Sequence, residues 1–209
     1  MKTLILVPTE FEADLVRSAL MSDPLDAAAI VQVCGFGPVT SGICTARLIT
    51  QLQPTRIILT GIAGTLSDDV AIGSACHFGS VALYGVGAGQ GQSFSTAQEL
   101  GWAQLSSADA RTVVDDIVML PASGSPNLLV TSCAASSTAD EAQWRREKFP
   151  HGIAEDMEGF SVAVACLLAN IPLEIIRGFS NVAGDRNKQN WRIDEAIAAA
   201  TDLVMERLS

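Results

Sequence analysis

The chain has 209 residues, of which 48% are hydrophobic and 17% are charged. This length and composition predict one folded domain with a sizeable aliphatic core, and they exclude a disordered chain. Lys and Arg number 13 and Asp and Glu number 23, which gives a formal net charge of −10. Such a balance argues against nucleic acid and anionic membranes as partners.

No apolar segment is long enough to cross a membrane. The most apolar run covers residues 160–169, whereas a helix that spans a bilayer needs about 20 residues. The first ten residues, MKTLILVPTE, contain too short an apolar stretch for a signal peptide. We therefore expect a cytoplasmic protein.

The cysteines and histidines do not suggest a metal site. There are five cysteines, an odd number, and no CxxC pair. We expect them to be reduced and mostly buried. The two histidines, His77 and His151, are far apart in the sequence, so we expect no metal.

Short apolar runs alternate with helical patterns along the chain. The runs that predict buried strands are residues 4–7, 29–33, 56–60, 128–131 and 172–176, with one or two further strands in 72–86. The patterns that predict helices are residues 11–19, 39–51, 139–148, 155–169 and 191–208. The nearly all-round apolar sequence of 155–169 predicts an internal helix.

Alternating strands and helices predict an α/β domain with a central mixed, largely parallel sheet. Ligands of such sheets bind beyond the carboxyl ends of the strands. The segments at those ends are residues 10–12, 35–37, 61–64, 131–137, 156–158 and 180–186, with 61–64 predicted as a tight loop. Glycines at every second position from 85 to 91 do not form a dinucleotide fingerprint, and we interpret them as a mobile loop or lid.

Several catalytic motifs are absent from the sequence. It contains no GxSxG, no GxxxxGK[ST] and no HExxH. The strand ends carry carboxylates, amides and glycine-rich backbone instead. These groups favour acid–base chemistry or hydrogen-bonded recognition of a polar small molecule.

Four segments, in order along the chain, carry a resemblance to a known family. They are PTEFEADLV (8–16), CGFGPVTSG (34–42), TGIAGTL (60–66) and EDMEGFSVAVACLLANIPLEIIRGFSNVAGDRNKQNW (155–191). Together they resemble the purine nucleoside phosphorylase/uridine phosphorylase superfamily, and most closely its hydrolase branch, which holds methylthioadenosine/S-adenosylhomocysteine nucleosidase and futalosine hydrolase. The resemblance implies a three-layer α/β/α fold, a nucleoside substrate, no cofactor, and a homo-oligomer in which a partner chain often completes the site.

The resemblance assigns roles to residues that have simpler explanations too. Glu12 would activate the water that attacks C1′ of the ribosyl group, although Glu12 and Glu10 are equally good acids for a helix start. Met157 and Glu158 would bind the ribose, as a carboxylate can accept hydrogen bonds from both vicinal hydroxyls. Ala63 and Gly64 would bring backbone close to the ribose.

Asn181 distinguishes among substrates, because the adenosine-type nucleosidases carry Asp there. The segment 180–191 looks like futalosine hydrolase. An amide can donate to a 6-oxo group while its oxygen accepts from a protonated N7, which suggests a 6-oxopurine such as hypoxanthine. Asn is a poor proton donor, so water or Asp185 would supply the N7 proton. The simpler explanation of Asn181 is a turn residue.

Further residues are expected to surround the base and the 5′ substituent. Residues 131–137, including Ala135 and Ser136, would form a wall beside the base, mostly through their backbone. The residues that could stack on the base are Phe179 and Phe94. The residues that could meet the carboxylate of a benzoate arm are Arg186 and Lys188, with Trp191 and Arg192 as others, although Trp191 also fits a helix staple. Arg177 suits a structural ion pair at least as well as a substrate contact.

The predicted reaction is hydrolysis rather than phosphorolysis. Where the phosphorylases of the superfamily carry an Arg and a hydroxyl for phosphate, this chain has Leu59 and Ile62. The resemblance therefore implies cleavage of futalosine to hypoxanthine and dehypoxanthinyl futalosine in menaquinone biosynthesis. The alternatives are a methylthioadenosine/S-adenosylhomocysteine-type or other purine nucleosidase, a phosphorylase, and a nucleoside binder without activity.

Overall fold

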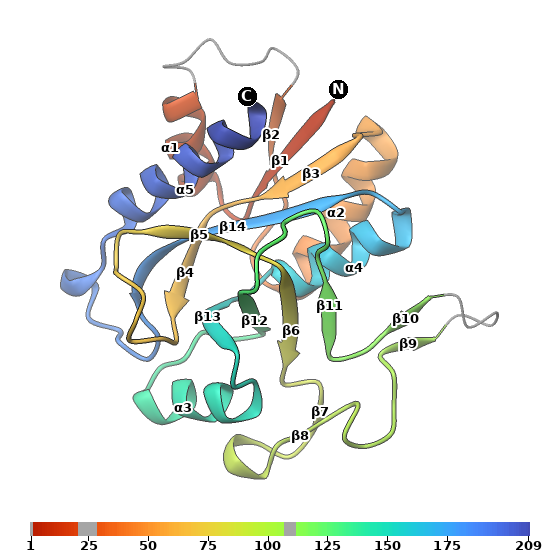
Figure 1. Ribbon diagram of the computed structural model, residues 1–209, viewed down its shortest axis with the longest axis vertical. Coiled ribbons are helices and arrows are strands. Elements are labelled where there is room, and N and C mark those ends of the chain that lie inside the picture. Colours follow the sequence, from red (N-terminus) through yellow and green to blue (C-terminus); the bar gives the residue numbers. More distant parts are fainter. Residues whose placement is uncertain (1, 21–28, 107–111) are drawn as a thin grey trace.

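The computed structural model describes residues 2–20, 29–106 and 112–209. A ten-stranded mixed sheet forms the middle layer (Figure 1). Its spatial order is β11 (Ile117–Met119), β6 (Ser80–Tyr84), β12 (Leu128–Ser132), β13 (Gly152–Asp156), β4 (Ile62–Thr65), β14 (Leu173–Val182), β3 (Arg56–Leu59), β1 (Thr3–Val7) and β2 (Ala29–Val33), while β5 (Ala75–Phe78) pairs with β14. The pairs β11–β6, β13–β4 and β14–β5 are antiparallel, and the remaining neighbours are parallel.

Two helices cover each face of the sheet (Figure 1). Helices α1 (Glu10–Leu20) and α5 (Ile193–Leu208) lie on one face, and α2 (Pro38–Leu52) and α4 (Gly159–Ala169) lie on the other. The apolar strand β1 faces both layers: Ile5 and Val7 pack under α1 and α5, and Leu4 and Leu6 pack under α2 and α4. A fifth helix, α3 (Ala139–Lys148), packs beside β13. This arrangement confirms the three-layer α/β/α fold.

Most predicted elements are found with small shifts at their ends. Strand β2 has the predicted bounds, as does helix α3, whose N-cap Thr138 accepts a hydrogen bond from the backbone of Glu141. Helix α2 begins at Pro38, a residue well suited to a first helical turn. The C-terminal helix begins at Ile193 rather than at residue 191.

Three predictions about local structure are wrong. Residues 155–156 end strand β13 rather than opening a helix, and α4 begins only at Gly159. Residues 62–65 form strand β4 rather than a loop. Strand β14 runs on for ten residues, well past the apolar stretch that predicted it. In each case a neighbouring strand supplies the ladder bonds, so pairing overrides local sequence preference.

Helix α4 is also less internal than its sequence suggests. Its first half is buried, but Leu167 and Leu168 are exposed at its end. Among the cysteines, all of which are free, Cys34 and Cys166 are buried, Cys44 and Cys76 are half-buried, and Cys133 is exposed. The expectation that the cysteines are mostly buried therefore holds only in part.

The glycine-rich segment folds into a small hairpin. Strand β7 (Gly87–Ala88) pairs with β8 (Ser95–Thr96), and the short 3-10 helix η1 (Gly91–Ser93) lies between them. Gly91 has a φ of +56°, and a Cβ there would lie 3.2 Å from the ring of Trp144 on α3. The segment thus rests against α3, and its movement as a lid stays a prediction. A second small hairpin joins β9 (Leu105–Ser106) to β10 (Val113–Val114).

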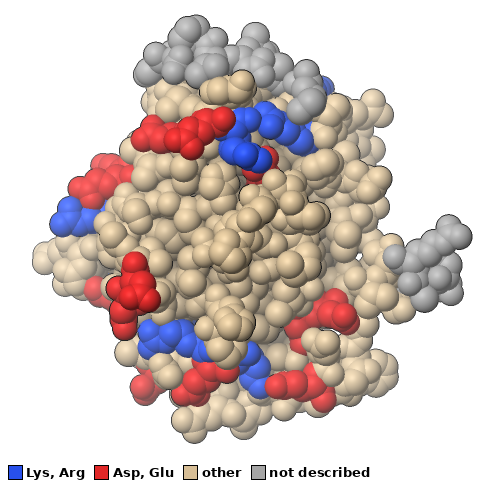
Figure 2. Space-filling model, in the orientation of Figure 1, with Lys and Arg blue, Asp and Glu red and all other residues tan. Residues whose placement is uncertain are grey.

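In the part of the chain that the structure describes, no helix is both long and apolar enough to cross a bilayer. Figure 2 shows one face of the molecule, on which Lys and Arg side chains lie beside Asp and Glu side chains instead of gathering into one basic surface.

Candidate active site

Arg177 is the central charge of the site. It lies on β14, and its side chain is fully buried. Its Nη2 donates to Asp156 Oδ2 at 2.5 Å and to Glu158 Oε2 at 3.1 Å, and its Nη1 donates to the carbonyl oxygen of Thr60 at 3.0 Å. A buried guanidinium requires such partners, so the sequence-based view of Arg177 as one member of an ion pair is confirmed.

Asp156 is the residue that the sequence misread. The predicted helix 155–169 places Asp156 in its first turn, whereas the residue lies at the end of β13 with its side chain buried. Besides the bond from Arg177, its carboxylate accepts from Thr131 Oγ1 at 2.6 Å and from the backbone N of Gly159 at 2.9 Å. The sequence does contain a signal for Asp156 as an ion-pair partner. A buried apolar strand leads into Arg177, and a buried arginine needs a carboxylate close by.

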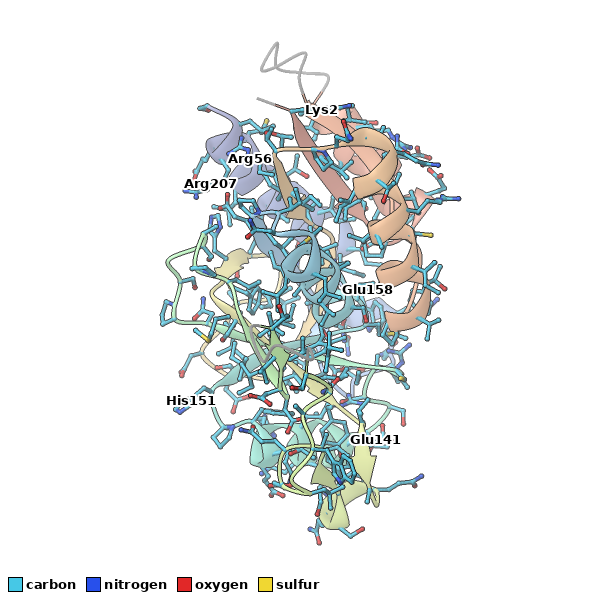
Figure 3. The ribbon with its side chains drawn as sticks, turned by 90° about the vertical axis from the view of Figure 1, so that its right-hand side faces the viewer. Lys2, Arg56, Glu141, His151, Glu158 and Arg207 are labelled. Atoms are coloured by element: carbon cyan, nitrogen blue, oxygen red, sulfur yellow. The ribbon has the colours of Figure 1, made fainter. Side chains whose placement is uncertain are left out.

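Glu158 connects Arg177 to the start of α2. Its Oε1 accepts a hydrogen bond from the backbone N of Gly37 at 3.0 Å. Burial raises the pKa of Glu158 to about 7, although the positive charge of Arg177 acts in the opposite direction. Figure 3 shows Glu158 in the middle of the molecule beside α2 and α4, well away from Glu141 on α3. The backbone of Gly37, the residue before α2, therefore holds the carboxylate of Glu158 in place.

Glu12 is held by two hydrogen bonds at the start of α1. Its Oε2 accepts from Thr9 Oγ1 at 2.6 Å, and its Oε1 accepts from the backbone N of Ile62 at 3.0 Å. The side chain of Glu12 is buried, whereas Glu10 is exposed and pairs with Arg17. The two acids that were equivalent in the sequence are therefore distinct, and only Glu12 faces the site.

Asn181 lies opposite Gly64, where the pairing of β14 with β4 shifts register. The side chain of Asn181 is buried rather than set in a turn. Its Oδ1 accepts from Ser180 Oγ at 2.8 Å, and its Nδ2 donates to the carbonyl oxygen of Val182 at 2.8 Å. A primary amide has two N–H donors and two lone pairs, so one donor and one acceptor remain for a ligand.

The residues expected around the ribose lie on the elements just described. Ala63 and Gly64 are consecutive residues of β4, and Met157 is half-buried between Asp156 and Glu158. The ribose-binding roles of Ala63, Gly64 and Met157 stay predictions.

The base-side wall at Ala135 and Ser136 stays a prediction, and the two candidate stacking residues are not free to stack. Ser136 is buried, and its backbone N and Oγ both donate to Glu155, while Ala135 is half-buried beside it. Phe179 lies in the core, edge-on to Phe78 with ring centroids 6.4 Å apart. Its ring is therefore not free to stack on a base. Phe94 is likewise buried, against Tyr84.

The loop after β14 holds Asp185 in hydrogen bonds of its own. Asp185 accepts from Asn190 Nδ2 at 2.7 Å and from the backbone N of Asn187 at 2.8 Å, and these bonds hold the pKa of Asp185 below its usual value. Such an acid keeps its negative charge at neutral pH. The structure therefore favours a loop-fixing role over the expected proton donation to N7.

A cavity of about 690 Å³ opens beside this loop. The residues that line it include Phe11, Lys188, Trp191 and Arg192. Two of its lining residues are linked to the site: Phe11 precedes Glu12 in α1, and the backbone N of Arg192 donates to the carbonyl oxygen of Ser180 at 2.8 Å. Arg186 lies over the ring of Trp191, with its guanidinium carbon 5.0 Å from the ring centroid.

The polar side chains of the site are the carboxylates of Glu12, Asp156 and Glu158, the guanidinium of Arg177 and the amide of Asn181. Within residues 2–20, 29–106 and 112–209, no three His, Cys, Asp or Glu side chains are placed to hold a metal ion together. The arrangement can accept a proton at Glu12, accept hydrogen bonds from vicinal hydroxyls at Glu158, and bind a polar heterocycle at Asn181.

Comparison with known proteins agrees with this geometry. The model of the phosphorylase superfamily matches residues 26–92. The chain is 30% identical to a futalosine hydrolase of Streptomyces coelicolor over 81% of this chain and 74% of that protein. It is 28% identical to a 5′-methylthioadenosine/S-adenosylhomocysteine nucleosidase of Staphylococcus saprophyticus over 88% of this chain and 82% of that protein.

Solved structures show the same fold. The 5′-methylthioadenosine/S-adenosylhomocysteine nucleosidase of Colwellia psychrerythraea in complex with adenine has a TM-score of 0.77 at 21% identity, covering 100% of this chain and 94% of that one. The futalosine hydrolase of Helicobacter pylori has a TM-score of 0.75 at 14% identity, covering 99% and 97%. From sequence and fold together, this chain belongs to the phosphorylase superfamily, as a purine nucleosidase of the group that contains the futalosine hydrolases and the methylthioadenosine/S-adenosylhomocysteine nucleosidases.

Proposed function

We propose that the protein hydrolyses the N-glycosidic bond of futalosine and releases hypoxanthine, as a step of menaquinone biosynthesis. The observation that carries this choice of substrate is the amide of Asn181, together with a cavity lined by Lys188, Trp191 and Arg192 that is linked to β14 through the hydrogen bond from the backbone N of Arg192 to Ser180. An amide suits a 6-oxopurine, and the cavity offers the cation of Lys188 and an aromatic ring to a benzoate, while Arg192 pairs with Glu195 in the same lining. Similarity to the futalosine hydrolase of Streptomyces coelicolor adds independent support.

Glu12 is the general base of the proposed mechanism. A water molecule attacks C1′ and loses a proton to the carboxylate of Glu12 while the bond from C1′ to the purine nitrogen breaks. The purine leaves with the electron pair of that bond and takes up a proton at N7 from solvent. The hydrogen bonds from Thr9 and Ile62 support this role, because they fix the carboxylate in one orientation before the substrate binds.

Glu158 holds the ribose in this proposal. Its carboxylate accepts hydrogen bonds from O2′ and O3′, and the bond from Gly37 and the ion pair with Arg177 keep it in place. The negative charges of Glu12 and Glu158 also favour the positive charge that develops on the ribosyl group as the bond breaks.

Asn181 binds the base. Its free N–H donates to the 6-oxo oxygen, and its oxygen accepts from the protonated N7 of the leaving purine. Ser180 supports this orientation, since its hydroxyl donates to the amide oxygen and leaves the amide nitrogen directed at Val182 and the ligand.

Water fits this site better than phosphate does. Leu59 is fully buried, and the backbone N of Ile62 already donates to Glu12. Neither position supplies a cation or hydroxyl to a phosphate dianion, which would be costly to desolvate there.

The test is to measure the free base released from futalosine, inosine and methylthioadenosine, each with and without phosphate. We expect hypoxanthine from futalosine at the same rate in both conditions. Adenine from methylthioadenosine with futalosine left intact would assign the protein to the other nucleosidases of the group. Release that requires phosphate would make it a phosphorylase, and binding without release of any base would make it a nucleoside binder.

The benzoate contact can be tested separately with Lys188→Ala. Lys188 has no ion-pair partner among the described residues, and one exposed charge pair is worth up to about 1 kcal/mol. We therefore expect KM for futalosine to rise about fivefold. KM for inosine, which lacks the arm, is the control and should not change. An equal rise for both substrates would remove Lys188 from the proposal.

A further inference from the structure

A second buried ion pair lies apart from the one at Arg177. Arg145 of α3 and Glu155 of β13 are in contact through Nη1 and Oε2, with side-chain exposures of 6% and 4%. Arg145 also lies over the ring of Tyr84, with its guanidinium carbon 5.5 Å from the ring centroid. The pair thus joins helix α3 to two strands of the sheet.

The pair holds one short segment of backbone in place. Arg145 Nη2 donates to the carbonyl oxygen of Ala134 at 2.8 Å. Glu155 accepts from the backbone N of Ser136 at 2.8 Å and from Ser136 Oγ at 2.6 Å. Residues 134–136, which connect β12 to α3, are therefore fixed at two backbone atoms and one side chain.

This network is next to the base-binding residue. Glu155 pairs with Gly64 in the β13–β4 ladder, and Gly64 pairs with Asn181 in the β4–β14 ladder. A Cβ at Gly64 would lie 3.4 Å from Cγ of Glu155, so the two residues approach closely on one face. One residue further along β13, Asp156 binds Arg177. The second ion pair is thus separated from Asn181 by a single strand.

Stability alone does not account for this pair. Burying two charges costs desolvation energy, and an apolar pair of similar volume is often at least as stable. The cost is greater here because Arg145 Nε has no hydrogen-bond partner among the described residues. What an apolar pair could not do is fix the carbonyl of Ala134 and the N–H of Ser136.

We propose that Arg145 and Glu155 are positioning residues for purine binding: they hold residues 134–136 at a set distance from Asn181, so that this backbone forms the opposite wall of the base pocket. The proposal rests on the purine nucleosidase function of the chain but not on futalosine as the substrate. It accounts for a buried charged pair whose two members contact the same loop.

The main test is the double variant Arg145→Met/Glu155→Leu, which keeps the volume but removes the bonds to residues 134–136. We expect a folded protein whose Kd for hypoxanthine, measured by calorimetry, rises at least tenfold, and whose KM rises while kcat changes less. The matched control is Lys148→Met/Glu99→Leu, which removes an exposed ion pair at the end of the same helix and should leave Kd and KM unchanged.

Wild-type Kd and KM in the folded double variant would overturn the proposal. If the double variant fails to fold, Ser136→Ala decides instead, because it removes the side-chain hydrogen bonds of Ser136 with Glu155 and with Arg145 and keeps the ion pair. A weaker affinity for hypoxanthine at an unchanged melting temperature would support positioning, and an unchanged affinity would overturn it. The affinity for hypoxanthine is measured without any reaction. It therefore tests the positioning role even if the protein does not hydrolyse futalosine. A wild-type protein that binds neither hypoxanthine nor adenine would overturn both proposals.

Discussion

Glu12 and Arg177 both lie against Gly61. A Cβ at that position would be 2.8 Å from Glu12 Oε1 and 2.7 Å from Arg177 Nη1. The φ of Gly61 is +135°, a backbone conformation that other residues rarely adopt. The absence of one side chain therefore allows the proposed base and the buried arginine to occupy the same corner of the site.

Gly61→Ala should displace these two side chains. We expect kcat/KM to fall by about a hundredfold, since a shift of about 1 Å at a reacting group has an effect of that size. Gly101→Ala is the control, because Gly101 also has a positive φ but no atom lies within 4 Å of its Cβ position. Equal activities of the two variants would show that the contacts at Gly61 do not matter for catalysis.

Glu12→Gln should separate catalysis from binding. The amide keeps the shape of the side chain but cannot accept a proton from water, so we expect kcat to fall by about 10²- to 10⁴-fold. The affinity for hypoxanthine should stay within about twofold, because the residue proposed to bind the base is Asn181. Glu10→Gln, two residues earlier and exposed, is the control and should behave as wild type. Substantial turnover by Glu12→Gln would assign the base to another residue.

Asn181→Asp should change which purine is accepted. A carboxylate accepts from a 6-amino group and repels a 6-oxo group, so the ratio of kcat/KM for inosine to that for adenosine should fall at least about tenfold. The two nucleosides share the same ribose, which removes any effect on sugar binding from the ratio. An unchanged ratio would mean that Asn181 does not read position 6.

Glu158 should make both stability and binding depend on pH. Its pKa of about 7 in the folded protein exceeds the ordinary value of 4.5, so the folded state binds more protons between those values. Its contribution to the free energy of unfolding is therefore full below pH 4.5 and lost as the pH rises through 7. In the proposed mechanism the ionised carboxylate of Glu158 binds the ribose, so KM should fall over the same rise in pH.

Glu158→Gln is the variant that checks this dependence. It should flatten the change in unfolding free energy between pH 4.5 and 7, measured by urea titration at several pH values. A slope equal to that of the wild type would assign the pH dependence to other groups.

The sequence predicts the layers of this fold well because the buried strands and amphipathic helices follow simple periodicity. It fails where tertiary pairing decides. The sequence predicts Glu155 and Asp156 in the first turn of a helix. They instead end strand β13, where Arg145 and Arg177 neutralise their charges. The sequence could not show which of Glu10 and Glu12 turns inward, since that depends on Ile62 in a distant strand.

The predicted site residues divide in the same way. Glu12 lies beyond the carboxyl end of β1 and accepts a hydrogen bond from Ile62 at the start of β4. Glu158 lies just beyond the end of β13, which runs antiparallel to β4, and Asn181 lies on β14 opposite Gly64 of β4. The sequence could not show whether the ring of Phe179 faces the core or the site. Neighbouring residues of β14 face opposite sides of the sheet, and the pairing of β14 with β4 shifts register after Phe179. The hydrogen bonds of Asp185 depend on the path of the loop after β14, which sequence spacing does not define.

Strand β14 carries both Arg177 and Asn181, and it pairs with β3, β4 and β5 together. Its amides can exchange with solvent only when strands far apart in the sequence separate, so hydrogen exchange there should report opening of the whole domain. The loop of residues 185–191, by contrast, lies beyond these ladders and makes most of its hydrogen bonds within itself. We therefore expect the proposed catalytic groups and the proposed contacts to the 5′ substituent to open separately, so that heat abolishes discrimination of the 5′ substituent before it abolishes cleavage.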